Sequence, residues 1–157
     1  KKRIDNLRNI NPDIAIRTSI IVGFPGETDV EFKQLLDFIK EIEFDRLGVF
    51  TYSEEEGTHG ADAFTDDVPA EVKDERKDEV MLLQQSINLR KNKELVGTTQ
   101  RVLIDMCNAQ GISLGRTYRD SPEIDNYVKI EEKIEPGTFC DVKITEAMEY
   151  DLRGERC

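Results

Sequence analysis

The sequence predicts an α/β part followed by a small all-β barrel, and three patterns carry this prediction. The first 96 residues contain two apolar, β-branched segments, and a helical repeat follows each of them along the chain. From Gly97 onward the pattern changes to short runs with a period of two, separated by turn residues. A chain of 157 residues is long enough for one ordinary domain or two small ones. We therefore expect two domains, 1–96 and 97–157.

The chain opens with a short amphipathic segment and then a strongly apolar one. Ile4, Leu7 and Ile10 recur on one side of a helix, which Asn11-Pro12-Asp13 would end. A helix that begins at the first residue without a cap suggests a further segment upstream. Residues 15–22 end in Ile20-Ile21-Val22, which are apolar at consecutive positions. Such a run predicts a strand buried on both faces.

A glycine turn and a helix come directly after this strand. Gly23-Phe24-Pro25-Gly26 breaks the strand, and Thr28 with Glu31 three residues later forms a capping-box pattern. The helix should run from Thr28 to about Glu43. Its apolar side chains recur at helical spacing, at Phe32, Leu35, Leu36, Ile39 and Ile42.

A second strand, 46–52, completes a β-α-β unit, which we expect to be parallel and right-handed. The loop that follows it, 53–67, leaves the same end of the sheet as the glycine turn. Both loops should therefore lie side by side at the C-terminal ends of the strands, where α/β proteins bind ligands. Spacing alone leaves the glycine turn open to two interpretations, a ligand-binding turn or a plain connection. Two parallel strands cannot form a domain alone, so further strands or a dimer through the open edge must cover them.

A long helix over 70–96 links the two parts of the chain. Val72, Val80, Leu83 and Ile87 can face a core, and the Lys, Asp and Glu side chains between them should face water. The helix stops before Gly97, a suitable residue just past a helix end. About five short strands then fit a small closed barrel of the OB type. They are expected at 101–107, 112–117, 127–130, 140–144 and 150–154.

Composition restricts the partners of this chain. The net charge of −11 argues against a nucleic-acid backbone as the main partner, and it suits either a basic protein or a plain solvated surface. Residues 97–157 carry 12 Asp and Glu against 8 Lys and Arg. No apolar run approaches the roughly 18 residues that span a membrane, and the start lacks the apolar core of a signal peptide.

The sulfur-containing residues and the single histidine have no ligand-like spacing. Three widely separated cysteines without a Cys-x-x-Cys pair predict neither a disulfide framework nor a zinc site, and they suit the reducing cytoplasm. Cys107 and Cys140 lie in strand-like runs and are expected to be small buried apolar residues. His59, in the polar loop, has no ligand-spaced partner. We expect all three methionines, Met81, Met106 and Met148, to fill cores.

Several separated motifs resemble one enzyme family. The segment Ile-Arg-Thr-Ser-Ile-Ile-Val-Gly-Phe-Pro-Gly-Glu-Thr at 16–28 closely resembles a signature of the radical S-adenosylmethionine methylthiotransferases. The strand and loop at 48–58 look like the family's next barrel strand. Residues 115–125 look like its TRAM domain, and 150–155 resemble its chain end. The RimO branch, which methylthiolates an aspartate of small-subunit ribosomal protein twelve, fits best.

This resemblance implies a partial radical S-adenosylmethionine barrel followed by an OB-like TRAM barrel. The complete enzymes of the family use S-adenosylmethionine and two four-iron–four-sulfur clusters. Neither of the family's cluster-binding cysteine motifs occurs here, so the cluster ligands are absent from this chain and the chain alone should be inactive. The acidic TRAM part favours a basic ribosomal protein as partner, with transfer RNA as the less favoured substrate.

The resemblance also implies cofactor-binding residues, whereas it implies no catalytic or metal-ligating residue in this chain. Ile21, Gly23 and Phe24 would line the adenine or ribose side of S-adenosylmethionine. Arg17 would bind the cofactor's carboxylate, or else pair with a neighbouring strand. Phe50 and Tyr52 would pack under the adenine, or else be plain barrel core.

Two other functions remain open at this point. One is the related branch that modifies an adenosine of transfer RNA, which would require salt-sensitive binding of RNA by the TRAM part. The other is a non-enzymatic module that binds a partner through the β-barrel.

Overall fold

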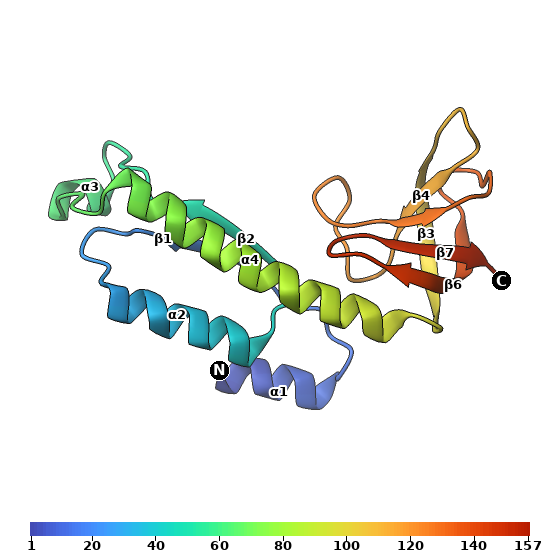
Figure 1. Ribbon diagram of the computed structural model, residues 1–157, viewed down its shortest axis with the longest axis horizontal. Helices are drawn as coiled ribbons and strands as arrows, with labels where there is room; N and C mark the ends of the chain where they lie inside the picture. The colour runs from blue at the N-terminus through green and yellow to red at the C-terminus, as the bar shows by residue number, and fades with distance from the viewer. The chain divides into compact units, whose positions relative to one another are not determined.

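The computed structural model describes residues 1–157, and the chain forms two compact units (Figure 1). The first unit comprises residues 1–12 and 16–84, and the second comprises 13–15 and 85–157. The first is an α/β unit with a two-stranded sheet, and the second is a closed β-barrel. The predicted fold class, an α/β part followed by a five-stranded barrel, is therefore confirmed.

The first unit contains the predicted β-α-β arrangement. Its elements are α1 (Lys2–Ile10), β1 (Arg17–Val22), α2 (Asp29–Ile42), β2 (Arg46–Thr51), α3 (His59–Ala63) and the first part of α4 (Ala70–Leu95). Strands β1 and β2 are parallel, with Arg17 opposite Arg46 and Val22 opposite Thr51. The sequence predicted each of these elements except α3, a single short turn of helix inside the polar loop.

The start of α2 is fixed by the predicted capping box. The backbone N–H of Thr28 donates to Oε2 of Glu31 at 2.8 Å, and the N–H of Glu31 donates back to Oγ1 of Thr28 at 3.3 Å. Two N–H groups that a helix start leaves without partners are thereby satisfied. The helix buries four of its five predicted apolar side chains, Phe32, Leu36, Ile39 and Ile42.

The prediction that β1 is buried on both faces is wrong for this chain. Val22 is fully buried, whereas the side chain of Ile21, on the opposite face, is 57% exposed. The buried apolar side chains of this unit come from α2, Phe44, α4 and one face of the sheet, and no segment of the unit covers the other face. The apolar run therefore marks a two-sided strand of which this chain covers only one side.

Helix α4 buries Val80 and Ile87 as predicted. The prediction that its Lys, Asp and Glu side chains face water is wrong at one position. Lys73 was expected to face water, but it is only 7% exposed, and Arg76, which that prediction did not include, is 6% exposed. Gln84 is buried as well, and its Nε2 donates to the carbonyl of Phe44 at 2.8 Å. Burial of these groups is tolerated because each is hydrogen-bonded to a backbone or carboxylate oxygen.

The second unit is a closed barrel of five strands in the order β3-β4-β5-β7-β6 (Figure 1). The strands are β3 (Thr99–Cys107), β4 (Ser113–Arg116), β5 (Val128–Ile130), β6 (Phe139–Ala147) and β7 (Leu152–Arg156). Strands β5 and β7 are parallel, and the other neighbours are antiparallel. All five predicted strands are present, and closure leaves no sheet edge free.

The barrel interior is apolar and tightly packed. Its core consists of Val102, Ile104, Val128, Ile130, Ile134, Cys140, Val142, Ile144 and Leu152. A Cβ atom on Gly115 would lie 2.6 Å from the carbonyl oxygen of Leu103, so only glycine fits where β4 crosses β3.

The methionines do not fill the cores as predicted, since Met81 and Met148 are only half-buried and Met106 departs furthest. Met106 was expected to fill the core, but its side chain is 53% exposed. The pairing of β3 with β4 shifts by one residue between Ile104 and Met106. This β-bulge reverses the in/out alternation after the buried Ile104, so Met106 points away from the core.

Candidate functional site

The glycine turn after β1 is held by carboxylates on both sides. Gly23 and Gly26 have φ angles of +71° and +82°, which favour glycine. The N–H of Gly23 donates to Oε1 of Glu27 at 3.1 Å, and the N–H of Gly26 donates to Oδ1 of Asp67 at 2.7 Å. Since Asp67 ends the loop after β2, the two loops meet at one end of the sheet as predicted.

Two buried cations of α4 also contact this turn and the loop after β2. Nη1 of Arg76 donates to the carbonyl and to Oε1 of Glu27, at 3.1 and 2.9 Å, and Nη2 donates to Asp29 at 2.8 Å. Nζ of Lys73 donates to the carbonyl of Tyr52 at 3.3 Å and bonds Asp66. A Cβ atom on Gly23 would lie 2.3 Å from Cγ of Lys73. The ends of both strands are therefore fixed to one helix.

The predicted site residues Phe24 and Tyr52 lie together at this end of the sheet. Their rings meet edge to face with centroids 5.1 Å apart, and Phe24 also meets Phe64 at 5.6 Å. The Tyr52 hydroxyl is buried without a hydrogen-bond partner. Phe24 keeps 40% of its surface exposed. Phe64 is 46% exposed, so this cluster presents two accessible aromatic side chains beside the glycine turn.

The predicted residues Arg17, Ile21 and Phe50 lie on the open face of the sheet. Ile21 and Phe50 are opposite one another in the register, and they are 57% and 59% exposed. Arg17 lies opposite Arg46 at the other end of the same strands. The six candidate residues thus fall into two groups, an open face with Arg17, Ile21 and Phe50, and a strand-end group with Gly23, Phe24 and Tyr52.

Sequence reasoning missed three members of the strand-end group. Lys73 and Arg76 look like the other charged residues of an exposed helix, and Phe64 is an isolated aromatic residue in a polar loop. Only the helical spacing of residues 73, 76 and 80, which places both cations on the face of Val80, could have indicated their burial.

The cysteines lie in or next to the barrel strands. Cys107 is half-buried, Cys140 is buried and Cys157 is exposed, and all three are free thiols. Burial raises the pKa of the Cys140 thiol, so this group stays protonated. No group of three His, Cys, Asp or Glu side chains is arranged to hold a metal ion. None of the helices combines the length and the apolar character that crossing a membrane requires.

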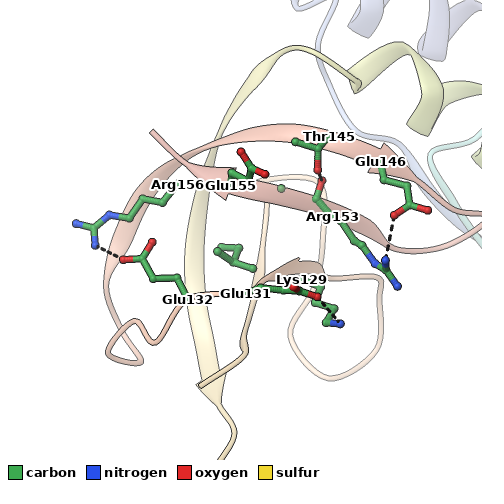
Figure 2. A pocket seen from close by; sticks show the side chains of 10 residues that line it. Lys129, Glu131, Glu132, Thr145, Glu146, Arg153, Glu155 and Arg156 are labelled. Carbon is green, nitrogen blue, oxygen red and sulfur yellow. Dashed lines mark hydrogen bonds and ion pairs between the residues drawn. The ribbon is translucent and has the colours of Figure 1, made fainter. Parts of the chain in front are cut away.

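Two of the hollows on the barrel surface have contrasting linings. The first, of about 430 Å³, lies over β5, β6 and β7 and is lined by charged side chains (Figure 2). Three ion pairs cross it, Lys129–Glu131 and Arg156–Glu132 at 3.2 Å and Arg153–Glu146 at 3.1 Å. Every cation there is already paired with a carboxylate of the same surface.

The second hollow, of about 360 Å³, lies between the bulged part of β3, β4 and the segment 121–127. Its apolar lining consists of Met106, Leu114, Pro122 and Tyr127, and Met106 lies opposite Leu114 in the register. Its charged lining consists of Asp105, Glu123, Asp125 and Arg116. We call this hollow the β3–β4 groove.

Comparisons with known proteins match both units. The family model described as TRAM domain matches residues 96–157. The chain is 46% identical over 155 residues to "Ribosomal protein uS12 methylthiotransferase RimO" of Thermus thermophilus, with 98% of this chain and 36% of that protein covered. The proteins of the same name from Clostridioides difficile and Prosthecochloris aestuarii are 46% and 44% identical, with 98% and 96% of this chain and 35% of each protein covered. The chain thus spans about a third of these curated relatives, in their C-terminal part.

Proposed function

The chain belongs to the RimO family, whose C-terminal region with its TRAM domain it matches, and on this premise we propose that it is the C-terminal part of a methylthiotransferase. The complete enzyme would add a methylthio group to the β-carbon of an aspartate in uS12, small-subunit ribosomal protein twelve. The observation that supports this proposal most is an identity of 44–46% that extends over 96–98% of the chain, across both units. We take 1–96 as the end of the radical S-adenosylmethionine barrel and 97–157 as the TRAM domain.

The open face and the strand ends fit a role in binding S-adenosylmethionine. When bound, this cofactor would supply the radical that abstracts hydrogen in the proposed reaction. Ile21 and Phe50 would offer an exposed apolar platform, and Phe24 would border it beside the rigid glycine turn. Arg17, on the same face of the sheet as Ile21, would bind a carboxylate.

The residues of this chain do not fit an iron–sulfur cluster. Such clusters need several cysteine thiolates at one place. The three cysteines all belong to the barrel unit, and no metal-ligating group of residues forms. We therefore derive no step through a cluster here, and we expect no turnover by residues 1–157 alone.

A basic ribosomal protein is a better partner for this TRAM domain than transfer RNA. With 12 acidic against 8 basic residues in 97–157, the domain would repel a phosphate backbone and attract a cationic protein. Because uS12 is a ribosomal protein, we also propose that the reaction takes place in the cytoplasm. The open sheet face would be covered by further barrel strands of the complete enzyme, or by a second copy of the chain.

A chimeric enzyme tests the proposal directly. The C-terminal third of Thermus thermophilus RimO would be replaced by this chain, and methylthiolation of uS12 would be followed by mass spectrometry. We expect the chimera to modify uS12 and a deletion of the same third to be inactive. Modification of transfer RNA instead, or salt-sensitive binding of transfer RNA by residues 1–157, would assign the chain to the adenosine-modifying branch.

A further inference from the structure

Arg76 is a buried cation of α4 whose hydrogen bonds end on the segment that joins β1 to α2. Its Nη1 donates to the carbonyl of Glu27 at 3.1 Å and to Oε1 of the same residue at 2.9 Å, and its Nη2 donates to Oδ1 of Asp29 at 2.8 Å. The guanidinium also lies over the ring of Phe32, 5.3 Å from its centroid. A planar group held at four points has one position and one orientation.

Glu27 passes this restraint on to the glycine turn. The Oε1 atom that accepts from Arg76 also accepts the N–H of Gly23 at 3.1 Å. The N–H of Glu27 in turn donates to the carbonyl of Phe24 at 2.9 Å, which closes the turn. Glycine can adopt many backbone conformations, so the φ of +71° at Gly23 must be selected by contacts such as these. The conformation of the turn therefore depends on a carboxylate whose own place depends on Arg76.

Stability alone is a poor explanation for this arrangement. The side chains of Arg76 and Glu27 are only 7% and 14% exposed, so both charges lose most of their hydration. Two apolar residues in their place would stabilise a fold equally well or better, because they pay no such penalty. What the ion pair supplies, and an apolar pair cannot, is an oxygen atom at a fixed position facing the N–H of Gly23.

The turn carries two of the residues that we expect to border S-adenosylmethionine, Gly23 and Phe24. Phe24 is 40% exposed, and its ring is also set by edge-to-face contacts with Tyr52 and Phe64. A binding surface that is already in its bound conformation pays no ordering cost when the ligand arrives. If the turn sampled other conformations, the apparent affinity would fall by the fraction of time it spends in them.

We propose that Arg76 is a positioning residue for the cofactor, which acts through Glu27 to hold the turn 23–26 in the conformation that binds S-adenosylmethionine. This inference rests on the proposed function, which assigns the cofactor to the turn. The turn would lie on the adenine or ribose side of the cofactor, so it takes no part in bond breaking. Its contacts are then equally strong before and during the reaction, and losing them raises KM without lowering kcat.

The test uses the chimera of Thermus thermophilus RimO that carries this chain as its C-terminal third. We expect Arg76→Met to raise the KM for S-adenosylmethionine about tenfold and to leave kcat within about twofold. Calorimetry should show the same loss of about tenfold in affinity for S-adenosylhomocysteine, which binds without reacting. A purely structural role gives the opposite result, because loss of folded enzyme lowers kcat and leaves KM unchanged.

A second variant tests the path through Glu27. Glu27→Ala should raise KM as much as Arg76→Met does, and the double variant should raise it no further, because both changes remove the same restraint on Gly23. Arg76→Lys keeps the charge without the second arm of the guanidinium, so it should recover part of the affinity. Effects of Arg76→Met and Glu27→Ala that multiply in the double variant would overturn the proposal.

Arg116→Met is the matched control. Arg116 lines the β3–β4 groove of the other unit and is likewise a largely shielded arginine, 24% exposed, paired with a carboxylate, Asp105. Its loss should destabilise the barrel and leave the KM for S-adenosylmethionine within about twofold. Equal increases in KM from Arg76→Met and Arg116→Met would show a general effect of lost stability and would overturn the positioning role.

The outcomes also separate this inference from the proposed function. A chimera that binds S-adenosylhomocysteine, more weakly with Arg76→Met, but leaves uS12 unmodified would refute the proposed substrate and support the positioning role. A chimera that modifies uS12 with the same KM in Arg76→Met would refute the positioning role alone. A chimera that binds no S-adenosylhomocysteine would refute both.

Discussion

Arg76 stabilises the turn after β1 through the carboxylate of Glu27. The side chains of both residues are shielded from water, at 7% and 14% exposure, and Oε1 of Glu27 is shared between Arg76 and the N–H of Gly23. Removing one partner of such a pair leaves a shielded charge uncompensated, which costs about 3–5 kcal/mol. We expect Arg76→Met to lower the free energy of unfolding by about 3 kcal/mol, measured by urea denaturation.

Two further variants separate the loss of this ion pair from the loss of the side chain itself. Arg90→Met removes an exposed cation of the same helix that pairs with Glu94, and it should change stability by about 0.5 kcal/mol or less. Adding Glu27→Gln to Arg76→Met should recover part of the loss, because the carboxylate that is shielded from water is then removed, whereas Asp29, the other partner of Arg76, is 98% exposed. A double variant less stable than Arg76→Met would contradict this account.

Glu31 makes the stability of α2 depend on acidity. The hydrogen bond from the backbone N–H of Thr28 lowers the pKa of the Glu31 carboxyl below its ordinary value of 4.5. A carboxyl whose pKa is lowered by folding stabilises the folded state above its unfolded pKa, and this contribution disappears as the pH falls through the folded pKa. We expect acidification from neutral pH to below 4.5 to destabilise the chain more than it destabilises Glu31→Gln, whose amide oxygen can accept the same bond at any pH. Glu56→Gln, in the exposed acidic loop, should behave like the unchanged chain.

At the scale of elements, the two faces of the β1–β2 sheet should respond oppositely to substitution. Ile21 and Phe50 are more than half exposed, so Ile21→Ser with Phe50→Ser removes little buried surface. We expect this double variant to keep the unfolding midpoint and to bind markedly less of the dye ANS. Val22→Ala, on the buried face, should cost about 2 kcal/mol and leave dye binding unchanged. Equal destabilisation by both changes would mean that the open face is covered.

Local patterns predicted the elements because each pattern has a local cause. The capping box at Thr28 and the apolar repeat of α2 act within a few residues, and the alternation of the barrel strands requires only a filled interior. The same reasoning located the glycine turn and the loop after β2 at one end of the sheet.

The failures have non-local causes. Burial of Lys73 and Arg76 depends on carboxylates and carbonyls up to 49 residues away in the chain, which no helical pattern contains. The outward position of Met106 depends on a bulge in the pairing of β3 with β4. The exposure of one face of β1 depends on which segments cover the sheet. The apolar run shows only that the strand is suited to burial on both faces, and it does not show which segments are present to bury it.

At the scale of the whole molecule, net charge follows directly from the amino-acid composition. The chain carries 33 acidic and 22 basic residues, and the cited ion pairs of the barrel join four of its cations, Arg116, Lys129, Arg153 and Arg156, to neighbouring carboxylates. The surplus negative charge is therefore available to a partner. If residues 1–157 bind uS12, as the proposed function expects, calorimetry should show binding that weakens as salt is added, because salt screens exposed charges over about 10 Å.

The two units should also differ in local stability, because the barrel has no free sheet edge and the β1–β2 sheet has two. Each strand of the barrel has a neighbour on both sides, around a core of nine buried apolar residues. β1 and β2 each have one neighbour and an unpaired edge, and one face of their sheet is exposed. Backbone segments with fewer buried contacts open at lower free energy, so their amide hydrogens exchange faster.

We expect hydrogen exchange in peptides covering 17–22 and 46–51 to be at least about tenfold faster than in peptides covering 101–104 and 140–144. This ratio corresponds to a difference of about 1.4 kcal/mol in the free energy of opening. Equal protection in the four peptides would mean that the sheet opens only when the barrel unfolds, and that the uncovered face does not weaken it.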